Sequence, residues 1–137
     1  MSHSLKVVGE SQKRMYGPRG ILVCGFSADE RKTIVKMFSD KKFKKLPVLF
    51  TTPDDQNTLM KEMIIRAHQS GMEGECKLDP AIIMSGLTEK ELHRTMSTYK
   101  KLKMTKPLWA TLTPTSENWT VTALISELNS ERLHLEK

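Results

Sequence analysis

Apolar positions in this chain gather in short runs that alternate with stretches of helical spacing. The runs cover residues 21–24, 46–51, 81–85 and 108–112, which are lengths typical of buried β-strands. After each run, apolar side chains recur at the spacing of an amphipathic helix. The pattern therefore predicts strand, helix, strand, helix, and then the same order again.

Two helix starts carry a recognisable cap. Ser27 with Glu30, and Thr88 with Glu91, have the spacing of a capping box, in which the hydroxyl accepts a helix N–H and the glutamate reaches back. These signals predict that helices begin directly after the first and third strands.

The other two helices have weaker start signals. Asp54 or Asp55 is predicted to cap the helix after the second strand, and Ser116 or Asn118 the last helix.

The two halves of the chain align without a gap after a shift of 61 residues. Thr52-Pro53 then falls on Thr113-Pro114, and the glycine turns after the first and third strands coincide. This self-similarity predicts an internal repeat with halves 20–70 and 81–131. The alternative is that any two units of this kind share such turn and cap residues.

Strands that alternate with helices favour parallel pairing through right-handed crossovers. We predict an α/β domain over residues 20–137, in which two tandem β-α-β-α repeats form one four-stranded, mainly parallel sheet of order 2-1-3-4 with helices on both faces. The crossover would reverse between the first and third strands, where open α/β sheets usually bind ligands. A mixed sheet of two β-α-β units packed antiparallel is the alternative.

Length and cysteine content narrow the class of protein. The 137 residues suit one domain, and two cysteines exclude a disulfide-rich scaffold or a four-cysteine zinc site. No apolar run reaches membrane-spanning length. We expect a soluble protein of a reducing compartment, either the cytoplasm or, after removal of an import peptide, the plastid stroma.

The positive charge is unevenly placed. The chain carries a net charge of +6, and residues 1–19, with four basic side chains and one acidic, account for +3. We predict a flexible basic arm, either a solvated tail or a segment that folds onto a nucleic acid or protein partner. Its basic residues are Lys6, Lys13, Arg14 and Arg19.

Two lysine runs precede the predicted outer strands, and in the predicted topology both lie on one edge of the sheet. That edge is either a solvated face or a contact for nucleic-acid phosphates or an acidic partner. The runs are Lys41, Lys42, Lys44 and Lys45, and Lys100, Lys101, Lys103 and Lys106.

The two glycine turns are candidates for an anion site. Gly25 with Ser27, and Gly86 with Thr88, would meet at one end of the predicted parallel sheet, where helix N–H groups favour negative charge. The structural alternative is a pair of tight, capped turns, since no phosphate-binding glycine motif is present.

The loop after the fourth strand is the other candidate for recognition. Thr113, Thr115, Glu117, Asn118 and Trp119 combine hydroxyls, a carboxylate, an amide and an indole, and tryptophan is frequent at interface hot spots. The structural alternative is that Pro114 ends the strand and Trp119 anchors the last helix.

The C-terminal half resembles a small family of short bacterial proteins, with some plant relatives, whose function is unknown. The resemblance rests on Leu112-Thr113-Pro114-Thr115, Asn118-Trp119, Leu124, Glu127-Leu128 and Glu131-Arg132, together with Gly86 and Pro107, over residues 81–133. It implies a shared fold unit and carries no activity.

Catalysis has little support in the sequence. No histidine lies in a nucleophile motif, and no His, Cys and Asp cluster has metal-ligand spacing, so we expect no metal and no cofactor. The first hypothesis is a non-enzymatic module that docks on a protein partner. A nucleic-acid-associated protein and a small-ligand or nucleotide sensor at the sheet switch point are the alternatives.

Overall fold

The computed structural model describes residues 13–72 and 77–135. It contains strands β1 (Gly20–Cys24), β2 (Val48–Phe50), β3 (Ala81–Ser85) and β4 (Leu108–Thr111), α-helices α1 (Ala28–Phe38), α2 (Met60–Met63), α3 (Glu89–Lys101) and α4 (Val121–Leu135), and short 3-10 helices η2 (Lys41–Phe43), η3 (Pro53–Asp55) and η4 (Ser116–Asn118).

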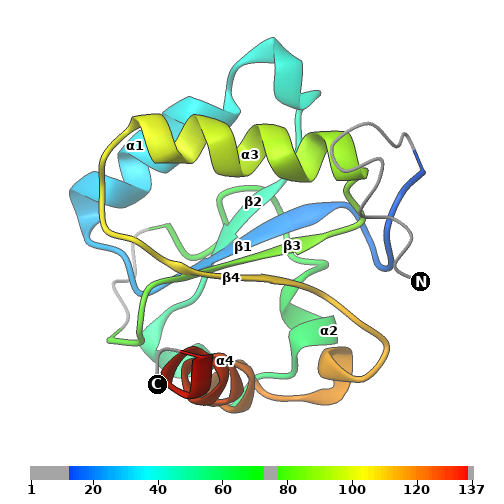
Figure 1. The fold of residues 1–137 in the computed structure, drawn as a ribbon, viewed down its shortest axis with the longest axis vertical. Helices are drawn as coiled ribbons and strands as arrows, with labels where there is room; N and C mark the ends of the chain where they lie inside the picture. The colour runs from blue at the N-terminus through cyan, green and yellow to red at the C-terminus, as the bar shows by residue number, and fades with distance from the viewer. Residues whose placement is uncertain (1–12, 73–76, 136–137) are drawn as a thin grey trace.

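The strands form a four-stranded sheet of order β2-β1-β3-β4, as predicted (Figure 1). β1 pairs with β2, and β3 with β4, in parallel. The central pair β1–β3 is antiparallel, with Gly20 opposite Ser85 and Cys24 opposite Ala81. Two of the three pairings are parallel, so the sheet is mainly parallel, as predicted. The expectation that the first and third strands also run parallel was wrong. Each half keeps a helix crossover between parallel neighbours, whereas the connection between halves enters β3 beside the end of β1.

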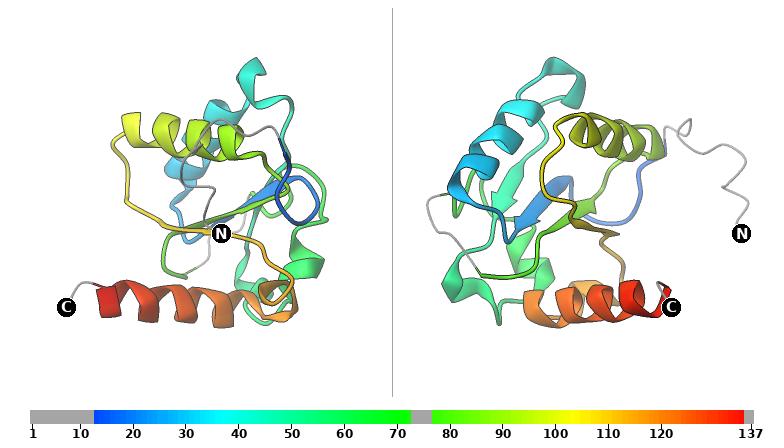
Figure 2. Two further views of the ribbon diagram at one scale, coloured as in Figure 1. Left: turned by 45° about the vertical axis from the view of Figure 1, so that its right-hand side comes forward. Right: turned by 60° about the vertical axis from the view of Figure 1, so that its left-hand side comes forward.

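Helices cover both faces of the sheet, as Figures 1 and 2 show: α1 and α3 on one, α2 and α4 on the other. Strand residues alternate between two cores because successive side chains point to opposite faces. Ile21 and Val23 join the α1/α3 core, and Leu22 and Cys24 the α2/α4 core.

The caps predicted for the helices after β1 and β3 are confirmed. Both capping boxes form: Ser27 accepts the Glu30 N–H at 3.3 Å, and Thr88 accepts the Glu91 N–H at 3.1 Å. At the last helix the Ser116 and Asn118 alternatives were both wrong, because Thr120 Oγ1 accepts the Ala123 N–H at 3.1 Å.

The helix after β2 begins differently from the prediction. Thr52 is the N-cap of η3, and Asp55 accepts from the Thr52 N–H at 3.0 Å to complete a capping box. α2 itself has four residues, Met60–Met63, much shorter than its apolar stripe suggested. The chain leaves α2 early and returns to the outer side of β2.

Several contacts between the halves join positions 61 residues apart. Leu22 lies opposite Ile83, and Leu59 bridges Thr120. The central strand pair and this bridge therefore both join the first half of the chain to the second.

Candidate functional site

Residues 13–19 pack along the turn between β3 and α3. Arg14 Nε donates to the Gly86 carbonyl at 3.0 Å, and the Arg19 guanidinium makes two hydrogen bonds with the Glu91 carboxylate, at 2.7 and 2.9 Å. The prediction of a flexible arm reaching residue 19 is wrong over this part, and both arginines serve internal contacts. Lys13 is exposed, and Lys6 lies outside the described residues.

The two glycine turns lie at opposite ends of the sheet, because β1 and β3 are antiparallel. Gly25 and Gly86 both have positive φ, and a Cβ at either would collide with a neighbouring backbone carbonyl. Close packing thus explains both glycines, while Ser27 and Thr88 serve the caps. A shared anion site between the turns was a wrong prediction.

The loop over residues 113–119 is braced internally. Thr113 and Ser116 hydrogen-bond through their hydroxyls at 3.1 Å, and Tyr16 Oη donates to Glu117 at 2.7 Å. This bond raises the pKa of Tyr16, with smaller contributions from desolvation and the Glu117 charge. Trp119 is partly buried against the α2/α4 core, which agrees with the anchor alternative.

Thr113, Thr115 and Asn118 are exposed in this loop. Asn118 Nδ2 donates to the Pro114 carbonyl at 3.4 Å, which ties the amide to the loop itself. Docking through the loop stays a prediction.

The lysine runs also lie at opposite ends of the sheet. One run precedes β2 and the other precedes β4, and these strands run in opposite directions because the central pair is antiparallel. The prediction of one continuous lysine edge was wrong. Each run instead borders its own depression between a helix and an outer strand.

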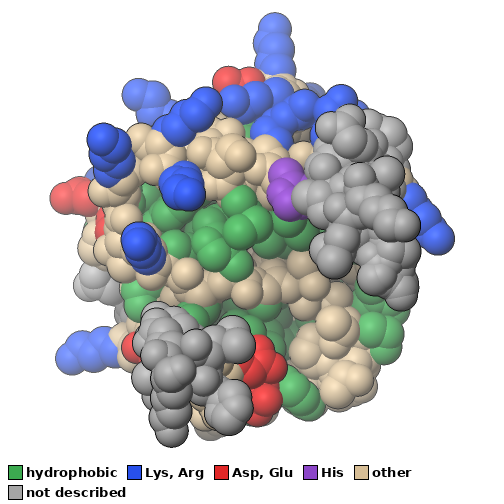
Figure 3. Space-filling view, in the orientation of Figure 1, with side chains coloured by type: hydrophobic (Ala, Val, Ile, Leu, Met, Phe, Trp, Pro, Cys, Tyr) green, Lys and Arg blue, Asp and Glu red, His purple; other side chains and the backbone are tan. Residues whose placement is uncertain are grey.

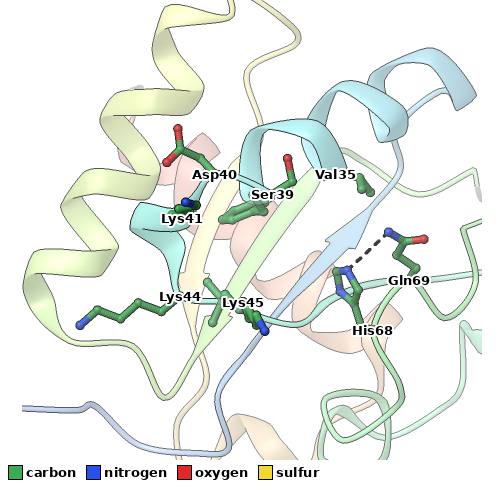
Figure 4. Close-up of a pocket in the computed structure, with 10 residues that line it drawn as sticks. Val35, Ser39, Asp40, Lys41, Lys44, Lys45, His68 and Gln69 are labelled. Carbon is green, nitrogen blue, oxygen red and sulfur yellow. Dashed lines mark hydrogen bonds between the residues drawn. The ribbon is translucent and has the colours of Figure 1, made fainter.

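The first depression, the α1–β2 hollow, has a volume of about 730 Å³. Figure 4 shows Lys41, Lys44 and Lys45 on one side of it and His68 and Gln69 on the other. Its floor is apolar and its cations are accompanied by one acid; it is lined by Val35, Phe38, Ser39, Asp40, Lys41, Lys44, Lys45, Leu46, His68 and Gln69.

The second depression, the α3–β4 groove, has a volume of about 540 Å³. Apolar side chains line it, together with three lysines and a histidine and with no acid: His93, Met96, Ser97, Tyr99, Lys100, Lys103, Met104, Lys106, Pro107 and Trp109. Figure 3 shows an apolar area on this face, with lysine or arginine side chains at one end and a histidine at the other.

The two outer strands differ in what lies beside them. The edge of β2 is covered by residues 68–70: the Val48 N–H donates to His68 Nδ1 at 3.0 Å, the Gln69 N–H to the Val48 carbonyl at 2.7 Å, and the Phe50 N–H to the Ser70 carbonyl at 2.9 Å. No such segment among the described residues pairs with the outer edge of β4.

The direction of the β4 backbone follows from its inner bonds. Leu108 and Leu112 donate toward the β3 side, to the carbonyls of Pro80 and Met84 at 2.8 and 2.9 Å. Since N–H and C=O groups alternate sides along a strand, those of Trp109 point away from β3, and so do those of Thr111. β4 also contains no charge and no proline, the devices that usually protect an open edge.

Strained backbone occurs in the same two depressions. Of the described non-glycine residues, those with positive φ are Lys44, Lys45 and Gln69, which line the α1–β2 hollow, and Lys103, which lines the α3–β4 groove. Such conformations cluster at binding sites, and they also occur at helix ends.

Tyr99 is the lining residue of the α3–β4 groove whose pKa is clearly shifted. Burial raises the pKa of Tyr99 to about 12, and the charge of Glu30 adds to the effect. The phenol in the groove therefore stays protonated and donates to the Thr105 carbonyl. Among the described residues, no group of three or more His, Cys, Asp or Glu side chains is arranged to hold a metal.

Comparison with known proteins finds a match for the second half alone. Residues 80–135 match the model of DUF3783, a domain of unknown function. No curated protein and no solved structure matches the chain. The resemblance of the C-terminal half to a family of unknown function is thereby confirmed, and the matched segment holds the whole α3–β4 groove.

Sequence reasoning missed the groove itself. The apolar pattern predicted a helix after the third strand and a strand over residues 108–112, but Met96 in that helix and Trp109 in that strand are only partly buried. The available signal was Met104, an apolar residue within a lysine run that no predicted element buries.

Within residues 13–72 and 77–135, no helix is long and apolar enough to cross a bilayer.

Proposed function

We propose that this protein is a non-enzymatic docking module that binds a segment of a partner protein in the α3–β4 groove. The observation that carries the proposal is the open, uncharged edge of β4 directly beside an apolar groove. Partners add to exposed sheet edges because main-chain hydrogen bonds supply affinity and neighbouring pockets supply specificity.

The location differs from the loop and arm that the sequence suggested. Trp119 and the two arginines already have intramolecular contacts, so their removal would affect folding as well as binding. The groove residues combine partial exposure with apolar character, which is the combination expected of an interface.

A nucleic-acid function is less well supported. The lysine runs lie at opposite ends of the sheet and therefore form no single stripe along which a phosphate backbone would run. We treat nucleic-acid binding as one outcome of the test below.

We also propose that the halves 20–70 and 81–131 arose by duplication. Supporting this, Met60 N–H donates to the Trp119 carbonyl at 2.9 Å, and Val121 N–H to the Thr58 carbonyl at 3.0 Å; each bond becomes the other after the 61-residue shift.

The motif at residues 112–132 and its occurrence in bacterial and plant proteins remain predictions, as does a reducing compartment.

The test is selection of displayed peptides on the full-length protein, followed by affinity measurement on charge-reversed variants. Lys103→Glu with Lys106→Glu changes the groove. Lys41→Glu with Lys44→Glu makes the same charge change in the α1–β2 hollow and again includes one lysine of positive φ.

We expect the selected peptides to bind the wild type and the hollow variant equally, and to bind the groove variant at least about tenfold more weakly. The proposal fails if no peptide is selected or if both variants lose the same affinity. Labelled single-stranded RNA and duplex DNA are measured alongside. Tight binding that weakens steeply with salt would replace the proposal with a nucleic-acid function.

A further inference from the structure

We infer that the partner segment adds to β4 as a parallel β-strand and carries acidic residues just before the part that pairs. This inference rests on the proposed function and names the partner chemistry of the same groove. It is drawn from the way this chain covers its own other edge.

The segment at residues 68–70 serves as the template. It runs in the same direction as β2, since Gln69 bonds to Val48 and Ser70 bonds to Phe50 further along. Residues 68–70 form a turn, with the Ser70 N–H on the Ala67 carbonyl, and not a regular strand, yet they take up the outward groups of β2 in the order that a parallel neighbour would. His68 completes the pairing with its side chain instead of its backbone.

Among the described residues, no segment covers the equivalent positions on the outer edge of β4. A shift of 61 residues carries Val48 to Trp109 and Phe50 to Thr111, whose outward N–H and C=O groups meet no hydrogen-bonding partner in the part of the chain that is described. The shift carries residues 68–70 to 129–131, which belong to α4 on the other side of the sheet (Figure 1). Because α4 continues where α2 ends early, the second half supplies no cover of its own.

Charge decides which end of the incoming strand is acidic. Lys103 and Lys106 lie in the connection that enters β4, and Lys100 lies in the last turn of α3 just before it. His93 lies near the start of α3, toward the other end of the groove. In a parallel arrangement the N-terminal end of the partner segment therefore meets the lysines.

The apolar lining defines the rest of the segment. Strand side chains alternate, so every second residue of an added strand faces the α1/α3 side, as Trp109 does. There it meets Met96, Met104 and Pro107. The occupant is thus a segment with glutamate or aspartate first and alternating apolar residues after.

The experiment uses full-length protein and two synthetic peptides of the same composition. The first has a run of glutamates followed by alternating valine and threonine, and the second has the reverse order. Both are blocked at their ends and labelled for fluorescence anisotropy. Backbone amide hydrogen exchange, followed by NMR, reports on Trp109 and Thr111 directly.

We expect the first peptide to bind about tenfold more tightly than the second and to slow exchange at Trp109 and Thr111 at least about tenfold. Thr111→Pro removes one outward N–H and should abolish this binding, while Thr111→Val keeps the N–H and the affinity. The exchange measurement on the wild type decides the matter if the proline variant does not fold.

Four results overturn the inference. Binding without slowed exchange at the two amides means that the segment docks without strand addition, and the proposed function survives. Equal binding of the two peptides removes the polarity. Failure of both, while display-selected peptides still bind the groove, removes the acidic partner. Slowed exchange in concentrated protein without peptide means that a second copy occupies the edge.

Discussion

The two outer strands of the sheet are alike in short length and lack of charge, but their outer edges have opposite environments. β2 reads Val-Leu-Phe and β4 reads Leu-Trp-Ala-Thr, both short, uncharged and bordered by lysines. β2 is covered by the chain that follows α2, and β4 is left open beside a groove. Whether an edge is covered or open therefore depends on where the following helix ends, and not on the strand itself.

A proline placed at each of the two outer edges should separate them most strongly. Gln69→Pro removes the N–H that donates to Val48 and requires φ of about −65°, so it should cost about 3 kcal/mol; the native φ is 66°. Thr111→Pro should cost about 1 kcal/mol or less, because its N–H points outward. Urea unfolding followed by tryptophan fluorescence measures both, and equal losses would contradict the comparison.

The capping glutamates of the two halves, Glu30 and Glu91, differ in burial and in their partners. Glu91 is buried and binds Arg19, whereas Glu30 accepts from Thr105 at 2.8 Å near the surface. Glu91→Gln should cost about 2 kcal/mol and Glu30→Gln less than about 1 kcal/mol at neutral pH. Urea unfolding at neutral pH measures both, and a larger loss for Glu30→Gln would show that the surface box matters more.

The dependence of stability on acid pH tests the role of Glu91 in a second way. Burial alone would raise the pKa of Glu91, but hydrogen bonds from Arg19 and Thr88 outweigh it, so the pKa is lowered. A lowered folded-state pKa contributes stability that is present above the unfolded value, about 4.3, and is lost as the pH falls through the folded value. The wild type should lose stability below about pH 4, and Glu91→Gln should reduce that slope. An unchanged slope would assign the loss to other carboxylates.

The smallest expected effect separates stability from binding. Lys103 and Lys44 both have positive φ, so replacing either with glycine should raise the unfolding free energy by about 0.5–1 kcal/mol. Lys103→Gly also removes a groove cation and should weaken the glutamate-first peptide by about threefold, while Lys44→Gly leaves it unchanged. Thermal unfolding and anisotropy measure the two properties, and a matching loss of affinity in both variants would remove the groove's charge preference.

Much of the local structure could be predicted from residues close together in sequence. The strand over Ala81–Ser85 and both capping boxes came from short-range patterns and appear as expected. The cap of α4 was missed because Thr120 competes with Ser116, and Ser116 instead bonds Thr113 within the loop. When several hydroxyl residues lie close together in sequence, capping preferences alone do not identify which of them caps the helix.

The candidate site was much less predictable. Every prediction that required two distant turns or lysine runs to lie together depended on the direction of β3 relative to β1. That direction is antiparallel, so Gly25 and Gly86 separate, as do the two lysine runs. Arg14 and Arg19 look like a free basic arm in sequence, and only the placement of Gly86 and Glu91 shows them to be internal partners.

The sequence by itself determined the order of elements, the alternation of strand side chains between two cores, and the caps at Ser27 and Thr88, because each depends on interactions within a few residues. Tertiary structure decided the antiparallel central pair, the cover of β2 by residues 68–70 and the open edge of β4. Backbone hydrogen-bonding groups are identical in every residue, so which of them remain unpaired is settled only when distant segments of the chain have packed.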